Sequence, residues 1–274
     1  HRGSYILKFD LQGNFIGNIG KPGRGPGELI NPLDFTIVDD KLYTLEQGKM
    51  QVQEFDIDGN YIDTYFFHGA YIELLKSSDN IILKNYYYSG MPEFTDMPKS
   101  ENFPLFTVLN LSTDSTYALG RYPSFFEELD INHSGSYSTL YDEKVYTVYK
   151  GFPFVQVHDL EKGLVNEIYL KGGIFTDVIE NYIRNPLDTY PAYFLNIKVN
   201  EYGIFLCSYG EHLFLYQFDF DGDLVNRFEI EKTDETDRYI RNFDIILSKG
   251  KRDKNKLYAT VHGINPRTLI VGFD

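Results

Sequence analysis

The sequence predicts an all-β fold, a six-bladed β-propeller of four-stranded antiparallel blades, and three observations lead to this prediction. The 274 residues include 23 Tyr and 22 Phe, side chains that favour pleated, half-buried strands. An alternating apolar strand that ends in an aromatic residue and Asp recurs about every 50 residues. A glycine-containing hairpin turn follows several copies of this strand. Four-stranded sheets repeated at such a spacing are the blades of a propeller.

The recurring aromatic-Asp pair marks the third strand, c, of each blade. It occurs at Phe9-Asp10, Phe55-Asp56, His158-Asp159, Phe218-Asp219, Phe273-Asp274 and, in degenerate form, at Leu109-Asn110. The c strands are therefore expected near residues 5–10, 50–56, 103–110, 153–159, 212–219 and 267–274. Six c strands predict six blades in a single domain over residues 1–274.

The other strands of each blade are expected around the c strand. A b strand begins at Lys41, Lys144 and Lys256, an apolar a strand precedes it, and a d strand follows the turn. The pattern contains five a, five b and five d strands against six c strands, because the first unit lacks a and b and the last lacks d. We expect upstream sequence to supply these strands, so that the propeller is N-terminally incomplete here. A five-bladed ring is the alternative.

Composition excludes some partners. The net charge of −14 repels phosphate backbones and anionic membrane surfaces, so nucleic acid is not an expected partner. No apolar run is long enough for a transmembrane helix. The single cysteine, Cys207, lies in an apolar strand, where we expect a small buried side chain rather than a reactive thiol.

Two insertions interrupt the repeats. Residues 89–102 lengthen a b–c loop, and residues 171–189 place apolar side chains at helical spacing, which predicts a short amphipathic helix in a d–a loop. Residues 123–130 are expected to form another helical turn.

One segment resembles an NHL repeat. It runs from the glycine-rich stretch Gly20–Glu28 through Asn31-Pro32 to the strands Lys41–Leu45 and Val52–Asp56. The chain is more narrowly similar to bacterial six-bladed propellers found as envelope lipoproteins, many without an assigned activity. This resemblance implies a periplasmic or surface-exposed binding scaffold, lipid-anchored through a cysteine in an upstream segment.

Three motifs suggest sites but fit structural roles better. The glycine run at 20–27 lacks the following helix that a dinucleotide loop needs, because prolines interrupt it, and we interpret it as a d–a crossover. The Asp-x-Asp-Gly turns at 56–59 and 219–222 lack the remaining ligands of a calcium loop. The six histidines show neither HExxH nor HxH spacing, so no metal site is assigned.

In a propeller the d–a and b–c loops share one face around the channel mouth, and a ligand is expected there. The predicted ligand-binding residues on this face are Arg24, Glu28, Glu46, Tyr86, Tyr87, Tyr88, Arg121, Tyr122, Tyr149, Lys150, Tyr209 and His262. Tyrosines offer flat apolar faces with a polar tip, which suits sugars and peptides, although packing between blades is the competing explanation.

The sequence thus favours a non-catalytic propeller of the bacterial envelope that binds a glycan, peptide or protein ligand, with no catalytic residues assigned. No cofactor is predicted, and a calcium ion in the central channel is the alternative. The alternative is a metal-assisted lyase or lactonase with a cation in that channel, and a purely structural spacer is a third hypothesis.

Overall fold

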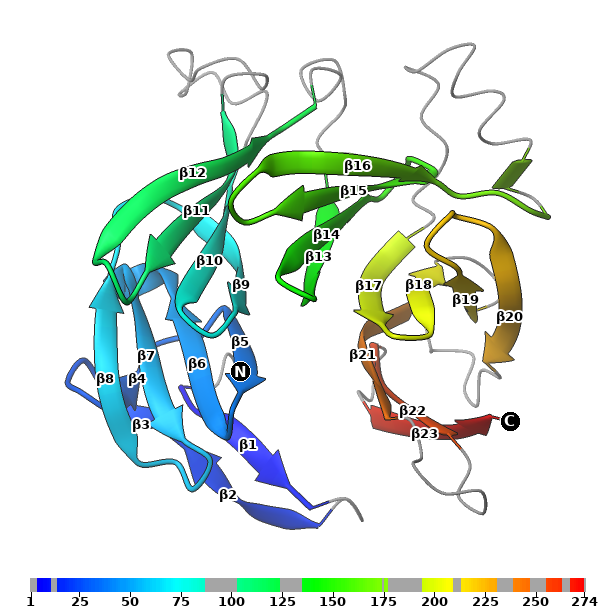
Figure 1. Ribbon diagram of the computed structural model, residues 1–274. Helices are drawn as coiled ribbons and strands as arrows, with labels where there is room; N and C mark the ends of the chain where they lie inside the picture. Colours follow the sequence, from blue (N-terminus) through cyan, green and yellow to red (C-terminus); the bar gives the residue numbers. More distant parts are fainter. Residues whose placement is uncertain are drawn as a thin grey trace, which may run out of the picture. The chain divides into compact units, whose positions relative to one another are not determined.

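The computed structural model describes residues 4–10, 14–86, 103–123, 135–173, 175–176, 194–208, 213–230, 239–246, 255–262 and 267–273 (Figure 1). Strands form nearly all of the regular structure in this part of the chain. The chain divides into two compact units, His1–Tyr88 with Asp96–Tyr122, and Ser89–Thr95 with Pro123–Asp274. Each unit is described by itself.

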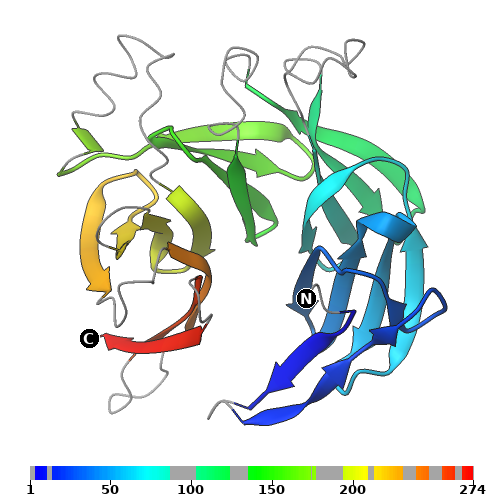
Figure 2. The same cartoon turned by 180° about the vertical axis from the view of Figure 1, so that it is seen from behind.

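The first unit contains one two-stranded and two four-stranded antiparallel sheets (Figures 1 and 2). The two-stranded sheet pairs β1 (Ile6–Phe9) with β2 (Phe15–Ile19). The next sheet has the order β5 (Asp34–Val38), β6 (Lys41–Glu46), β7 (Gln51–Asp56) and β8 (Tyr61–Phe66). The third sheet has the order β9 (Tyr71–Lys76), β10 (Asn80–Asn85), β11 (Pro104–Asn110) and β12 (Ser115–Arg121).

The second unit contains two four-stranded sheets and one of three strands. They are β13 (Ser136–Tyr141), β14 (Lys144–Tyr149), β15 (Phe154–Asp159) and β16 (Gly163–Tyr169); β17 (Phe194–Asn200), β18 (Gly203–Ser208), β19 (Leu213–Phe218) and β20 (Leu224–Ile230); and β21 (Tyr239–Ile246), β22 (Asn255–His262) and β23 (Arg267–Phe273). The all-β prediction and the four-stranded antiparallel sheets are confirmed. The single domain over residues 1–274 stays a prediction.

The strands follow the predicted order within each sheet. Strands β1, β7, β11, β15, β19 and β23 lie at the six predicted c positions. Neighbours in a sheet are neighbours in the chain, so each c strand pairs with the b strand before it and the d strand after it wherever both are described. The glycine-rich crossover adds an unexpected element, a parallel pair of β3 (Lys21–Pro22) and β4 (Glu28–Leu29).

The aspartates of the recurring pairs close the c–d turns. Asp56 Oδ1 accepts a hydrogen bond from the Asn60 amide at 2.8 Å, and its Oδ2 accepts one from Asn60 Nδ2 at 2.7 Å. Asp10 accepts the same two bonds from Asn14. The side-chain bond from Asn60 lowers the pKa of the Asp56 carboxyl. These carboxylates accept hydrogen bonds from donors within the turn. The aspartates are therefore explained by their role in closing the hairpin.

The insertions lie largely outside the described residues. Of the range 171–189, for which a helix is predicted, residues 171–173 and 175–176 are described, and among these only Phe175 and Thr176 are helical. The loop at 89–102 and residues 124–130 of the other predicted turn are not among them. A short 3₁₀ helix, η1 (Gln47–Lys49), joins β6 to β7.

Apolar side chains between strands form the cores. In the first unit Leu42 of β6 and Phe55 of β7 pack with Ile19 and Leu29 of the preceding strands. Cys207 of β18 is fully buried, and burial raises the pKa of its thiol to about 12, as expected for an inert core cysteine.

His158 takes the aromatic position of its pair and is buried in β15. Burial lowers the pKa of its imidazole from 6.5 to about 4. The unfolded chain therefore takes up the proton first, so this contribution to stability is complete above pH 6.5 and is lost progressively as the pH falls from 6.5 to 4. The expected loss approaches about 3 kcal/mol near that pH.

Replacing His158 by phenylalanine, the residue at four of the other five aromatic positions, is expected to remove this acid sensitivity. Urea unfolding at pH 7 and pH 4.5 measures it, with exposed His68→Gln as the control that keeps it. An unchanged difference between the two pH values in His158→Phe would contradict the assignment.

Candidate functional site

The glycine-rich crossover, residues 20–33, connects β2 to β5 and is folded back on itself. Its own carbonyls accept hydrogen bonds from the amides of Lys21, Gly23 and Glu28. Gly20 and Gly27 have φ values of 77° and 73°, which side chains with a Cβ rarely adopt. With these amides engaged inside the loop, the crossover does not offer a row of free donors to a phosphate.

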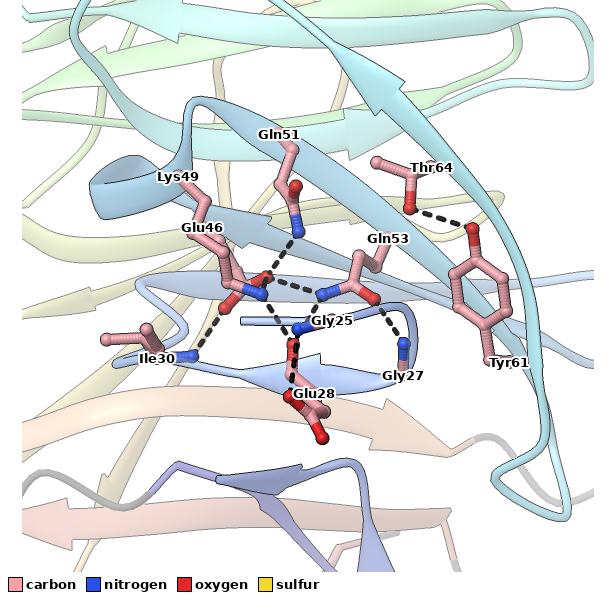
Figure 3. A network of polar contacts seen from close by, with 10 residues as sticks. All are labelled: Gly25, Gly27, Glu28, Ile30, Glu46, Lys49, Gln51, Gln53, Tyr61 and Thr64. Carbon is pink, nitrogen blue, oxygen red and sulfur yellow. Dashed lines mark hydrogen bonds and ion pairs between the residues drawn. The ribbon is translucent and has the colours of Figure 1, made fainter. Parts of the chain in front are cut away.

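A buried carboxylate at the end of β6 anchors the crossover (Figure 3). Glu46 is completely buried. Its Oε1 accepts a hydrogen bond from the Ile30 amide at 2.6 Å, and its Oε2 accepts bonds from Gln51 Nε2 at 2.9 Å and Gln53 Nε2 at 2.6 Å. Lys49 Nζ lies 3.0 Å from the same Oε2. A buried charge requires this degree of pairing.

Gln53 and Lys49 also bind the crossover directly. Gln53 Nε2 donates to the Glu28 carbonyl at 2.7 Å, and its Oε1 accepts from the Gly27 amide at 2.8 Å. Lys49 Nζ donates to the Glu28 carbonyl at 2.6 Å. The side chains of η1, β6 and β7 therefore hold the crossover at several points along its backbone (Figure 3).

The same link between the end of strand b and strand c recurs in two other sheets. In β13–β16 the Tyr149 hydroxyl donates to Gln156 Oε1 at 2.6 Å, and in β9–β12 Thr107 Oγ1 donates to Asn85 Oδ1 at 3.2 Å. Glu46, Asn85 and Tyr149 each close a b strand and are all buried. This position therefore serves as a polar anchor in three sheets.

Basic side chains lie on the outside of the anchored crossover. Arg24 is exposed, and Lys21 Nζ lies 3.5 Å from Glu28 Oε1 with most of its side chain in solvent. Glu28 Oε2 accepts a hydrogen bond from the Gly25 amide at 2.8 Å, and this bond is the main factor that lowers the pKa of the Glu28 carboxyl. A chain of net charge −14 thus carries two exposed cations on one hydrogen-bonded loop, and the Lys21 ammonium is paired with Glu28.

Three predicted residues come together at one end of the β9–β12 sheet. Tyr86 follows β10 and is exposed, and Arg121 ends β12 and is exposed. Tyr122 is buried, and its hydroxyl donates to the Asn85 carbonyl at 2.5 Å, next to Tyr86. This end of the sheet therefore presents an aromatic ring and a guanidinium to solvent.

The remaining predicted residues divide into described and undescribed ones. Tyr149 is buried, and Lys150 is half-buried with Nζ 6.0 Å from the centre of the Tyr137 ring. His262 ends β22, but its side chain is not described, and Tyr87, Tyr88 and Tyr209 lie outside the described residues. The polar atoms of three predicted residues are used inside the fold, in hydrogen bonds that hold loops and strands: Glu46, Tyr122 and Tyr149. The predicted ligand-binding residues that are exposed to solvent are Arg24, Tyr86 and Arg121.

Sequence reasoning missed Lys49, Gln51 and Gln53, the partners of Glu46. A usable signal in the sequence is the Gln51-x-Gln53 pair, because side chains two residues apart lie on the same face of a strand. In β7 the side chains from Gln51 to Phe55 are all buried. For metal binding, the described residues contain no group of three or more His, Cys, Asp or Glu side chains placed to hold an ion. None of the helices in the described part has the length and apolar character of a membrane span.

Antiparallel four-stranded sheets that follow one another in chain order define a protein of the β-propeller class. The sequence model of the family DUF5128, described as a 6-bladed beta-propeller, matches residues 2–163, and the chain belongs to this family. The family is thus a six-bladed propeller family, and the NHL-like character of the repeats stays a prediction.

Solved structures show the same fold at low sequence identity. A member of the DUF4221 family from Bacteroides vulgatus is 14% identical with a TM-score of 0.65, over 98% of this chain and 86% of that one. The structure of U3-55K is 12% identical with a TM-score of 0.55, over 98% and 75%. A Bacteroides fragilis protein, provisionally named as exported, is 14% identical with a TM-score of 0.50, over 93% and 74%. No curated protein matches the sequence.

Proposed function

We propose that this propeller is a non-catalytic binding protein whose d–a and b–c loops contact a glycan or peptide ligand. The observation that carries the proposal is the anchored crossover, in which a buried Glu46 network fixes a loop that exposes Arg24. A loop fixed before binding loses little conformational entropy when a ligand arrives, so its exposed groups contribute more of their interaction energy to affinity.

The exposed groups suggest the chemistry of the ligand. Arg24 and Arg121 supply guanidinium groups that can pair with carboxylates in two parallel hydrogen bonds. Tyr86 supplies a ring face on which a sugar or an apolar peptide side chain can stack. The proposed ligand is therefore a glycan or peptide that carries carboxylate groups.

The proposed location is the bacterial envelope, with a lipid anchor contributed by an upstream segment. It is supported by the resemblance to NHL-like envelope propellers and by the name of the Bacteroides fragilis protein with a similar fold. Fractionation of native cells, with and without extraction of lipid-anchored proteins, tests it. Recovery in the cytoplasmic fraction would contradict it.

Binding is tested on glycan and peptide arrays with the purified protein, followed by titration of the strongest hit. Arg24→Ala is expected to weaken binding about tenfold, the effect of about 1.4 kcal/mol. The matched control is Lys162→Ala, since Lys162 is another exposed cation and lies in the c–d turn between β15 and β16. Equal affinity of Arg24→Ala and the unmodified protein would contradict a role for the crossover.

Metal content separates this proposal from metal-assisted catalysis. Elemental mass spectrometry of the protein, dialysed against a little EDTA, is expected to find less than stoichiometric calcium or zinc. A near-stoichiometric ion would overturn the non-catalytic proposal and direct the search to lyase and lactonase substrates.

A further inference from the structure

Apolar side chains are exposed along the loops at one end of the first unit. Phe66 ends β8 and is 73% exposed, Met50 precedes β7 and is 49% exposed, and Tyr86 follows β10 and is 42% exposed. A single exposed apolar side chain is common on protein surfaces, whereas several at one place indicate a contact surface. We call these three residues the apolar rim.

Backbone hydrogen bonds join the members of the apolar rim into one surface. The amide of Phe67, the neighbour of Phe66, donates to the Met50 carbonyl at 3.1 Å. The Tyr86 amide donates to the carbonyl of Ala70, in the short crossover that follows β8, at 2.9 Å. The rim therefore runs from the b–c turn of one sheet, across the d–a crossover, to the b–c loop of the next sheet.

The crossover of residues 67–70 is held by its own contacts. The Phe67 and Tyr71 rings meet edge to face with their centres 4.8 Å apart, and the Tyr71 hydroxyl donates to the His68 carbonyl at 2.9 Å. Tyr71 itself is buried. Phe66 is therefore presented to solvent at the start of a loop whose conformation is fixed without a ligand, which lowers the entropic cost of binding.

The backbone at Met50 points to a role for its side chain. Met50 has a φ of 52°, which residues with a Cβ rarely adopt. The other non-glycine residues with positive φ in the described part of the chain are all Asn, Asp or Glu. Glycine would cost less at this position. A large apolar side chain that is both strained in its backbone and exposed to water indicates a contact made by that side chain.

Guanidinium groups lie on both sides of the apolar rim. Phe66 ends β8 and pairs with the first residue of β7, and Arg121 ends β12 and pairs with the first residue of β11, so the two hold equivalent positions in adjacent sheets. On the other side, Lys49 next to Met50 binds the crossover that carries Arg24. Both arginines are exposed. These charges complement a ligand with apolar groups between carboxylates.

We propose that the apolar rim binds the apolar side chains of an acidic peptide segment, whose carboxylates pair with Arg24 and Arg121. This inference rests on the proposed function and selects the peptide over the glycan. A sugar carries hydroxyl groups on most of its carbons and would leave them without partners against Phe66 and Met50. A peptide can place large apolar side chains on the rim and carboxylates on either side of it.

Fluorescence anisotropy with two labelled peptides tests this proposal. The probe Asp-Asp-Phe-Leu-Phe-Asp-Asp has an apolar centre between carboxylates, and Asp-Asp-Ser-Ser-Ser-Asp-Asp has the same charge without that centre. We expect the unmodified protein to bind the first peptide at least about tenfold more tightly than the second. Phe66→Ser is expected to weaken binding of the first peptide about tenfold. The matched control Ile62→Ser removes a 43% exposed side chain near the other end of the same strand and is expected to leave binding unchanged.

Met50→Gly gives a second variant that removes a side chain of the apolar rim. Glycine adopts a φ of 52° readily, so we expect the stability in urea unfolding to change little. Binding of the first peptide is nevertheless expected to fall at least about threefold, because the side chain that contacts it is gone. Loss of binding with unchanged stability separates a contact with the ligand from a structural role.

Equal affinity for the two peptides, or no binding of either up to about 1 mM, would overturn this inference. Equal affinity of Phe66→Ser and Ile62→Ser for the first peptide would overturn it as well, and the proposed function would stand if Arg24→Ala still weakened binding. Binding of a glycan that Phe66→Ser leaves unchanged would likewise retain the proposed function without the peptide. A dimer in light scattering that Phe66→Ser abolishes would assign the apolar rim to a second copy.

Discussion

Replacing Glu46 with alanine is expected to lower the free energy of unfolding by about 3 to 5 kcal/mol. The substitution leaves Lys49, nearly buried and 3.0 Å from the lost carboxylate, without its counter-ion. It also removes the acceptor for the Ile30 amide and for the side-chain amides of Gln51 and Gln53. Each buried donor left without an acceptor adds its own desolvation cost.

Urea unfolding of the unmodified and variant proteins measures the effect. Glu46→Gln is expected to lose less, because its amide oxygen still accepts from the crossover. Asp58→Asn is the control for the loss of a negative charge alone. The Asp58 side chain is exposed and its Oδ1 lies 3.9 Å from Lys8 Nζ, so we expect the stability of this variant to differ little from that of the unmodified protein. If Glu46→Ala is as stable as Asp58→Asn, the crossover is not held in the way described.

Replacing Gly203 with alanine is expected to cost about 3 to 5 kcal/mol. Gly203 begins β18 with φ at 127°, a conformation that residues with a Cβ rarely adopt. A Cβ placed there would overlap the carbonyl oxygen of Phe218 on the neighbouring strand β19. That contact is with backbone, so relief requires the β18–β19 pairing to shift.

Gly163→Ala provides the matched control. Gly163 also has a positive φ, at 79°, but a Cβ there meets no atom within 4 Å. Its substitution isolates the conformational cost, about 1 kcal/mol. Thermal unfolding of both variants separates the two causes, and equal losses of stability would show that the overlap with Phe218 contributes nothing.

Much of the strand pattern could be predicted because it is local. Alternation with a period of two places Leu42 and Tyr43 on opposite faces of β6, and the aspartates after Phe9 and Phe55 close turns with donors four residues away. These interactions involve residues close in sequence, so the residue types alone indicate them. The parallel β3–β4 pair is not visible in this way, because its two strands contain only two residues each.

The candidate site was predicted less well, for a physical reason. Proline and glycine identified residues 20–27 as a crossover, and Arg24 is exposed there as expected of a loop cation. Glu46 is predicted as a ligand-binding residue because it lies where the b–c loop begins, on the face expected to surround the channel mouth. Its burial depends on Ile30 and Gln53, which only the folded chain brings to it.

By itself, the sequence determined the all-β class, the order of strands within each sheet and the position of the crossover, because these depend on periodicity and on the backbone preferences of Gly, Pro, Asp and Asn. The tertiary structure decided which polar side chains are anchors and which face solvent. That choice depends on desolvation and on partners distant in sequence: Glu46 is buried because four groups compensate its charge, whereas Arg24 and Tyr86 remain exposed.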